Sequence, residues 1–353
     1  MRQRAARIPR IAGIATLAPL CALIGACAPP RLSSLDTGGP AALAIANLGW
    51  LLIGVCALVY AATLIALTIA VLRSRRRARR DTAMAPELLP QAAAEQRKTR
   101  IVSAALIGTF LILTLFVVAS FYTDRGIALA EREPALRIEI TAHQWWWEIR
   151  YLDPVASRGF VTANELHLPL NETAAITLRT PDVIHSFWIP GLAGKRDIIP
   201  GRDQELRLTA STAGEWRGRC AEFCGYQHAQ MQLLAIAEPR ADFDAWREHQ
   251  ASNAAPPQTE EQQRGEQLFG SASCIGCHVI RGSSATGYSA MAPDLTHLKS
   301  RRTLAAGTLP NTTAHLAAWV ADPQRIKPGV RMPVNRLNAD DYQSLLAYLE
   351  TLQ

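Results

Sequence analysis

The chain has 353 residues, enough for two or three domains, and a formal net charge of +7. Two stretches hold the basic excess: four arginines lie in the first ten residues, and residues 73–100 contain nine basic and three acidic side chains. The remainder is slightly acidic, which excludes a basic face for nucleic acid. The seven cysteines lack the even spacing of a disulfide scaffold.

Residues 1–26 are predicted to be a secretory signal peptide, because an arginine-rich start precedes an apolar run from Ile11 to Ala26. The sequence Ile24-Gly-Ala-Cys27 at the end of this run resembles a bacterial lipoprotein cleavage site. Two interpretations stay open. Cys27 is either the lipidated first residue of the mature chain or a plain thiol.

Residues 41–122 are predicted to form a transmembrane helical hairpin with spans at about 45–72 and 101–122. Both runs are uncharged and reach the roughly 20 residues needed to cross a bilayer. Core helices of a soluble protein are the alternative. The arginine cluster at 73–80 lies between the spans, so the positive-inside rule places this loop in the cytoplasm. Everything after Tyr122 is then expected on the opposite side, which in a bacterium is the periplasm.

An alternation of apolar and polar residues begins near Leu136 and predicts short strands. The expected strands cover residues 137–141, 165–168, 175–178 and 205–209. Short strands at such spacing predict an antiparallel sandwich or barrel over residues 133–250. His167 alternates with leucines and is assigned to the solvent face of its strand. His143 precedes a run of tryptophans and is assigned a structural role.

The segment Cys220-Ala-Glu-Phe-Cys-Gly-Tyr-Gln-His-Ala-Gln-Met231 combines two thiols, an imidazole and a thioether. Soft sulfur ligands together with imidazole are selected by copper or zinc, and a methionine beside them favours copper. The alternative is a disulfide between Cys220 and Cys224, with His228 and Met231 as ordinary loop residues. This segment therefore predicts a copper site with one competing interpretation.

A copper site with two thiolates needs further nitrogen ligation, and His185 in Asp182-Val-Ile-His-Ser-Phe-Trp-Ile-Pro190 is the candidate. These two segments together resemble cytochrome c oxidase subunit II. Lys195-Arg-Asp-Ile-Ile-Pro-Gly-Arg202 and His143-Gln-Trp-Trp-Trp147 are similar to other segments of the same family. The resemblance extends over roughly residues 40–240.

The resemblance implies a cupredoxin-like Greek-key domain that holds a dinuclear copper centre, CuA. The implied copper ligands are His185, Cys220, the backbone carbonyl of Glu222, Cys224, His228 and Met231. The Glu222 carboxylate is implied to help hold a magnesium ion at the interface with the catalytic subunit I. Trp145 matches the aromatic residue at which the family takes in electrons, and a core or interface tryptophan is the alternative.

Residues 251–258 are predicted to be a linker that follows a short helix over 241–249. A new domain is expected over residues 259–353, and Thr259-Glu-Glu-Gln262 resembles a capping box that opens its first helix. The domain contains Cys274-Ile-Gly-Cys-His278, the attachment signature of a c-type haem. A thioredoxin-like motif and half of a zinc site are the alternatives.

With this signature, Ala292-Pro-Asp-Leu-Thr-His297, Lys327-Pro-Gly-Val-Arg-Met-Pro333 and a terminal helix over 339–352 resemble a class I cytochrome c. The resemblance implies a covalently bound haem c. Cys274 and Cys277 are implied to attach the haem through thioether bonds, and His278 and Met332 are the implied proximal and distal ligands of its iron.

Three other side chains in this domain could compete for a metal. Met291 is the competing methionine and is less favoured than Met332. His297 and His315 are predicted to be surface residues.

Together these segments predict a multidomain membrane protein with a transmembrane hairpin, an all-β cupredoxin-like domain and an all-α cytochrome c domain. The resemblance implies subunit II of a haem-copper terminal oxidase in the bacterial inner membrane, with both redox domains in the periplasm. Electrons from a cytochrome c or another donor would pass through haem c and CuA to subunit I, which reduces O2 to water coupled to proton translocation. The implied partners are that donor, subunit I, further membrane subunits and the lipid bilayer. The small subunit of a CuA-containing nitric oxide reductase and a free membrane-anchored electron carrier are the alternatives.

Overall fold

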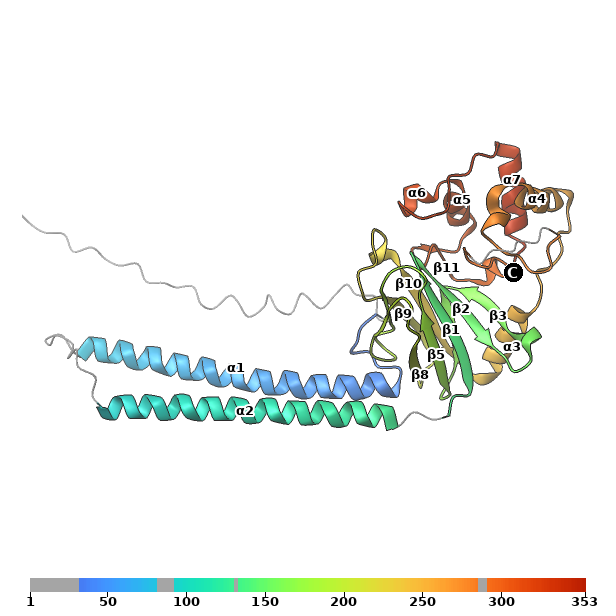
Figure 1. Cartoon of the computed structure of the whole chain (residues 1–353). Coiled ribbons are helices and arrows are strands. Elements are labelled where there is room, and N and C mark those ends of the chain that lie inside the picture. Colours follow the sequence, from blue (N-terminus) through green and yellow to red (C-terminus); the bar gives the residue numbers. More distant parts are fainter. Residues whose placement is uncertain (1–31, 81–91, 130–132, 285–290) are drawn as a thin grey trace, which may run out of the picture.

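The computed structural model of the chain describes residues 32–80, 92–129, 133–284 and 291–353. A pair of long helices, a β sandwich and a group of short helices follow one another along the chain (Figure 1). The predicted signal peptide and Cys27 lie outside the described residues.

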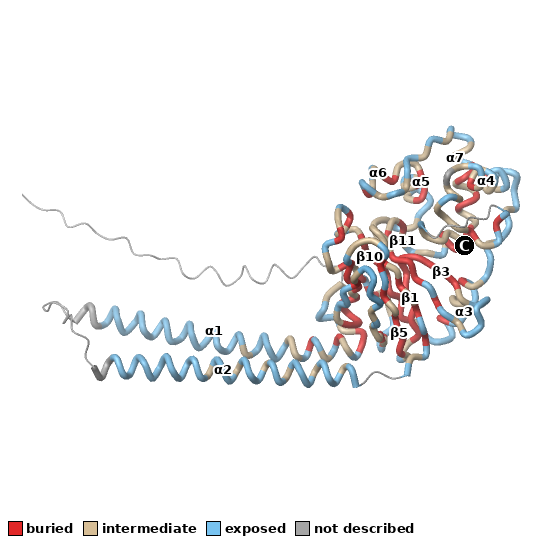
Figure 2. Tube along the Cα trace, viewed as in Figure 1, coloured by how far each residue is buried: buried red, intermediate tan, exposed pale blue. Residues whose placement is uncertain are grey.

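Helices α1 (Pro40–Arg80) and α2 (Ala92–Leu129) lie side by side and run in opposite directions. Each contains a stretch, of 37 and 35 residues respectively, that is long and apolar enough to cross a membrane. Most of their described residues are exposed (Figure 2). A helix of 41 residues is about 60 Å long, twice the thickness of a bilayer core, so it extends beyond the span predicted at 45–72.

Within the described residues, two five-stranded sheets form the sandwich, in the strand orders β3-β2-β1-β5-β8 and β4-β10-β9-β6-β7. The strands are β1 (Leu136–His143), β2 (Trp146–Leu152), β3 (Phe160–Ala163), β4 (Glu165–Pro169), β5 (Thr173–Arg179), β6 (His185–Trp188), β7 (Arg196–Ile198), β8 (Gln204–Thr209), β9 (Gly214–Cys220) and β10 (Gln232–Glu238). The predicted cupredoxin-like sandwich is confirmed. The prediction of an antiparallel sandwich needs one correction. Strand β5 pairs with β1 in parallel, and β10 pairs with β4 in parallel.

The core of the sandwich comes from the inward-facing residues of both sheets. Ile138 and Ile140 alternate with more exposed residues along β1, and Trp147, Ile149 and Phe187 are also fully buried. The rings of Trp147 and Phe187 meet edge to face with centroids 5.5 Å apart. Each such buried side chain contributes about 1.5–3 kcal/mol through removal of apolar surface from water.

Helix α3 (Arg240–Ala251) confirms the helix predicted over 241–249 and corrects the assignment of His167. His167 is buried on β4, with its ring stacked 3.8 Å from that of Trp246 on α3. Its Nδ1 lies 2.7 Å from a carboxylate oxygen of Glu238. The assignment to the solvent face was wrong because α3 covers this edge of the second sheet, a contact that the alternation along β4 does not reveal.

The C-terminal domain consists of short helices and one small hairpin. Its elements are α4 (Glu260–Ser271), β11 (Thr303–Leu304), β12 (Leu309–Pro310), α5 (Thr313–Ala321), α6 (Pro323–Ile326) and α7 (Ala339–Leu349). The capping box is confirmed, because the Thr259 hydroxyl accepts from the Gln262 amide and the Gln262 side chain accepts from the Thr259 amide. Helices α4 and α7 pack closely at Gly265, where an added Cβ would lie 2.0 Å from the Ser344 carbonyl.

Two expectations for this domain need correction. The terminal helix ends at Leu349 rather than Leu352, and Leu352 is fully buried in the core of the domain. His297 is buried, not on the surface, because its ring nitrogens contact the carbonyls of Ser252 and Gln353. This histidine packs against the segment predicted to be a linker. His315 is half-buried at the start of α5.

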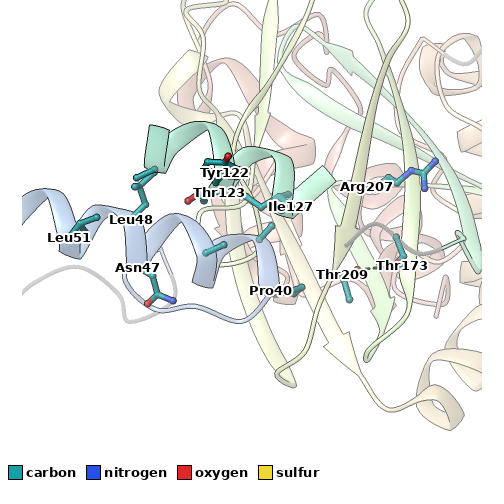
Figure 3. A pocket seen from close by; sticks show the side chains of 14 residues that line it. Pro40, Asn47, Leu48, Leu51, Tyr122, Thr123, Ile127, Thr173, Arg207 and Thr209 are labelled. Atoms are coloured by element: carbon teal, nitrogen blue, oxygen red, sulfur yellow. Dashed lines mark hydrogen bonds between the residues drawn. The ribbon is translucent and has the colours of Figure 1, made fainter. Parts of the chain in front are cut away.

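A cavity of about 510 Å³ lies where the helix pair meets strands β5 and β8 of the sandwich (Figure 3). Side chains of α1 and α2 form most of its lining, and Thr173, Arg207 and Thr209 of β5 and β8 complete it. None of the predicted metal or haem ligands lines this cavity, so it is separate from the redox sites.

Candidate metal centre

The ends of three strands bring the predicted copper ligands together. Cys220 ends β9 and Gln232 starts β10, so the segment between them is the loop that joins two paired strands. The amide of Cys220 donates to the carbonyl of Met231 at 2.9 Å and closes the base of this loop. His185 is the first residue of β6, and the pairing of β6 with β9 sets it beside Cys220.

The sulfur and nitrogen atoms of these residues face one another across a small space. The Cys220 Sγ lies 3.8 Å from the His185 Nδ1 and 3.2 Å from the carbonyl oxygen of Glu222. The Cys224 Sγ lies 3.6 Å from the His228 Nδ1 and 3.9 Å from the Met231 Sδ. Cys220 and Cys224 are free thiols, so the alternative disulfide is not formed here.

A buried carboxylate holds the first of these imidazoles in place. His185 is completely buried, and its Nε2 lies 2.8 Å from the Asp182 Oδ1. Burial opposes the charged forms of both groups, yet their mutual hydrogen bond raises the pKa of His185 and lowers that of Asp182. Because Nε2 is bonded to Asp182, Nδ1 is the nitrogen directed at the sulfur cluster. This role of Asp182 was not predicted from the sequence, although the residue stands only three positions before His185.

The two thiols lie within hydrogen-bonding contact of each other, an arrangement that fits a bound cation. A hydrogen bond from Cys224 lowers the pKa of Cys220, and the same contact raises the pKa of Cys224. One thiol therefore ionises at the expense of the other in the absence of a positive charge. A coordinated metal ion removes this conflict and deprotonates both. Two thiolates, two imidazoles and a thioether are the soft donor set that copper prefers, so the residues present fit a copper centre.

Trp145 and Gln144, in the turn between β1 and β2, support the loop of residues 220–231, called the copper loop below. The indole Nε1 of Trp145 and the side-chain amide of Gln144 both donate to the carbonyl of Cys224, at 2.9 and 2.8 Å. The neighbouring His143 stacks on Trp146 at 4.5 Å and has its Nε2 3.5 Å from Glu148, which agrees with the structural role predicted for it.

The haem-attachment motif forms a single tight turn after α4. Cys274 lies in the 3-10 helix η4 (Ser273–Gly276), and its carbonyl accepts from the amides of Cys277 and His278. The His278 Nδ1 lies 2.8 Å from the carbonyl of Pro293, which leaves Nε2 to bind iron, and burial lowers the pKa of His278 and favours the neutral ligand. The donor set therefore fits a c-type haem.

The remaining predicted site residues are less constrained by the structure. Met332 is half-buried, and its carbonyl accepts from the side chain of Gln324, whereas the Met291 residue is 62% exposed. The pairing of Met332 with His278 stays a prediction. Among the described residues, the metal-type cluster of His, Cys, Asp and Glu side chains comprises His185, Cys220 and Cys224, without the Glu222 carboxylate.

Comparison with known proteins agrees with this geometry. Residues 152–237 match the family "Cytochrome C oxidase subunit II, periplasmic domain", and residues 262–353 match the family "Cytochrome c". The sandwich with its sulfur–imidazole cluster thus defines a cupredoxin-like protein with a candidate copper site, joined to a cytochrome c domain.

Cytochrome c oxidase subunit 2 of Alkalihalophilus pseudofirmus is 34% identical over 254 residues, which cover 69% of this chain and 72% of the relative. The chain therefore belongs to the cytochrome c oxidase subunit II family. Cytochrome c oxidase subunit 2 of Bacillus subtilis is 30% identical over 63% of each chain. The crystal structure of the periplasmic domain of subunit II of cytochrome oxidase of Bradyrhizobium japonicum is 29% identical and covers 34% of this chain and 95% of that one, with a TM-score of 0.32.

Proposed function

We propose that this chain is the subunit of a haem-copper oxidase that accepts electrons at its cytochrome c domain and delivers them, through the copper loop, to a catalytic subunit I. Reduction of O2 to water, coupled to proton translocation, would take place in that partner. The observation that carries the proposal is that His185 on β6 lies against the loop that holds Cys220, Cys224, His228 and Met231.

This chain's own residues are suited to electron transfer rather than to substrate chemistry. A bound copper pair supplies reversible storage of one electron, and a bound haem c does the same in its own domain. The strands β6, β9 and β10 fix the ligands, and Asp182 fixes the His185 ring, so the ligand positions change little with charge. Phe223 and Tyr226 of the same loop are 74% and 92% exposed, a surface available to a partner.

The membrane arrangement follows from the helix pair. Two antiparallel spans return the chain to one side of a membrane, and the arginines at 73–80 favour the cytoplasm for the opposite end. Both redox domains would then be periplasmic, anchored to the inner membrane of a bacterium, with Cys27 as a candidate lipid anchor. Reporter fusions at residues 85 and 255 test this arrangement, because a cytoplasmic signal from the 255 fusion contradicts it.

Glu222 is the residue at which the family pattern places a magnesium ion. The Glu222 carbonyl contacts Cys220, and its half-buried carboxylate has Lys195 as a charged neighbour. Magnesium binding would need oxygen ligands from subunit I. We keep it as a proposal that metal analysis of the assembled complex would test.

Purification of the complex through a tag on this chain tests the whole proposal. We expect a many-span subunit with haem to co-purify, and the preparation to consume O2 with reduced cytochrome c as donor. Reduction of nitric oxide without O2 consumption would indicate a nitric oxide reductase instead. Recovery of the chain alone, with reversible redox spectra but no oxidase activity, would indicate a free electron carrier.

A further inference from the structure

Lys327 is buried to a degree that lysine rarely reaches. Its residue is 2% exposed, and its ammonium donates to three backbone carbonyls: Trp145 at 2.8 Å, Gln230 at 2.9 Å and Ala305 at 3.1 Å. Lysine is almost never fully buried without partners, and an ammonium has three N–H donors for these three acceptors. Burial lowers the pKa of Lys327 to about 7, and the nearby Cys224 opposes this shift.

The three carbonyls belong to three separate segments. Ala305 lies in the β11–β12 hairpin of the cytochrome c domain, to which Lys327 also belongs. Trp145 lies in the β1–β2 turn, and Gln230 directly precedes the predicted ligand Met231. Two of the three hydrogen bonds of Lys327 therefore cross from the cytochrome c domain to the copper-binding domain.

The residues after Lys327 continue this contact. The Pro328 carbonyl accepts from the side chain of Gln227 at 2.7 Å. Gly329 has a φ of +86°, and a Cβ built on it would lie 3.8 Å from the Trp145 ring, an ordinary van der Waals contact. This segment leads to Met332, and Trp145 in turn donates to the carbonyl of the predicted ligand Cys224.

A second set of contacts seats the rest of the cytochrome c domain on the sandwich. The Glu165 carboxylate on β4 accepts from the amides of Arg302 and Thr303 at 2.6 and 3.0 Å. The amide of Gln232 donates to the carbonyl of Ala306 at 3.1 Å. The amide hydrogens of Arg302, Thr303 and Gln232 exchange with solvent when the two domains separate, so their exchange rates report on docking.

We propose that Lys327 is a positioning residue that holds the Met332 loop of the cytochrome c domain against Trp145 and the copper loop. The docked arrangement is then built into the chain and does not depend on a chance encounter of tethered domains. It also gives the cytochrome c domain of the same chain a fixed place beside Trp145 and the copper loop, independent of an external donor. The purpose of this contact rests on the proposed function, whereas the contact itself does not.

Removal of the Lys327 ammonium tests the proposal. Lys327→Met keeps most of the aliphatic stem but leaves three carbonyls without their donor in a closed interface, which weakens docking. Lys299→Met is the matched control, because the Lys299 ammonium pairs with Glu350 inside the cytochrome c domain, 3.1 Å away. Hydrogen–deuterium exchange is measured on the full chain, loaded with haem and copper, in detergent.

In Lys327→Met we expect the amides of Gln232, Arg302 and Thr303 to exchange at least about tenfold faster than in the wild type, with α4 and α7 unchanged. The control should match the wild type at these three amides. Unchanged exchange there in Lys327→Met would overturn the proposal. Faster exchange throughout the cytochrome c domain, α7 included, would also overturn it, because Lys327 would then stabilise that domain alone.

A second variant guards against a general loss of folding. Gln227→Leu alters only the copper-binding domain and removes the bond to Pro328, so a smaller increase is expected at the same amides. No increase would count against the loop contact. Photoreduction of the haem then measures electron delivery to copper, which should slow in Lys327→Met but not in Lys299→Met. A chain with no oxidase partner would still show the exchange result, so failure of the proposed function is seen separately.

Discussion

The indole Nε1 of Trp145 donates a 2.9 Å hydrogen bond to the backbone carbonyl of Cys224, while the backbone carbonyl of the same residue accepts from Lys327 of the cytochrome c domain at 2.8 Å. A single residue thus contacts the copper loop through its side chain and the neighbouring domain through its backbone. Trp145 is therefore placed to connect the two redox sites.

Trp145→Phe should slow electron transfer from haem to copper without loss of copper. The phenyl ring preserves an aromatic contact, whereas the hydrogen bond to Cys224 is lost and only that from Gln144 remains. Flash photolysis measures the rate, and elemental analysis measures copper. Trp246→Phe, in the stack on His167, is the control and should leave the rate unchanged. An unaltered rate in Trp145→Phe would remove this residue from the path.

Asp182→Asn should weaken copper binding by about 10- to 100-fold, the usual effect of losing the partner that orients a ligating histidine. The Asp182 carboxylate accepts from the amides of Gln144 and Val183 and contacts His185, and an asparagine amide cannot accept on both sides. Competition with a copper chelator measures the affinity. The exposed Asp203→Asn, which loses only its pairing with Arg179, should bind copper as the wild type does.

Cys220→Ser should abolish the electron paramagnetic resonance signal of a mixed-valence copper pair and leave the haem absorbance intact. The two domains have separate hydrophobic cores, so loss of the metal in one does not unfold the other. Reconstitution of the wild type should yield two coppers per chain. One zinc per chain with no copper would contradict the assignment of the site.

Met332→His should retain the haem, which Cys274 and Cys277 hold covalently, and lower its reduction potential. A methionine–histidine pair raises the potential relative to other axial pairs. Potentiometric titration measures the change. Met291→Leu is the control and should have little effect, since Met291 is 62% exposed. Loss of the methionine-ligated spectrum in Met291→Leu would show that the ligand assignment is reversed.

The local chemistry of both sites could be read from the sequence. Cys220, Cys224, His228 and Met231 lie within one loop, so their spacing alone indicates a soft metal site. The haem signature, the capping box at Thr259 and the alternating strands are likewise short-range patterns, in which each residue acts on near neighbours. These predictions needed no knowledge of how distant segments pack.

Only the tertiary structure decided the environment of the isolated histidines and of Lys327. The sequence around His167 and that around His297 indicate exposure, but α3 covers the first and the segment after α3 covers the second. Lys327 directly follows the short helix α6 and carries no sequence signal of burial, because its three acceptors are backbone carbonyls of Trp145, Gln230 and Ala305. Backbone carbonyls are present at every position, so a site built from them depends on the fold and not on residue type.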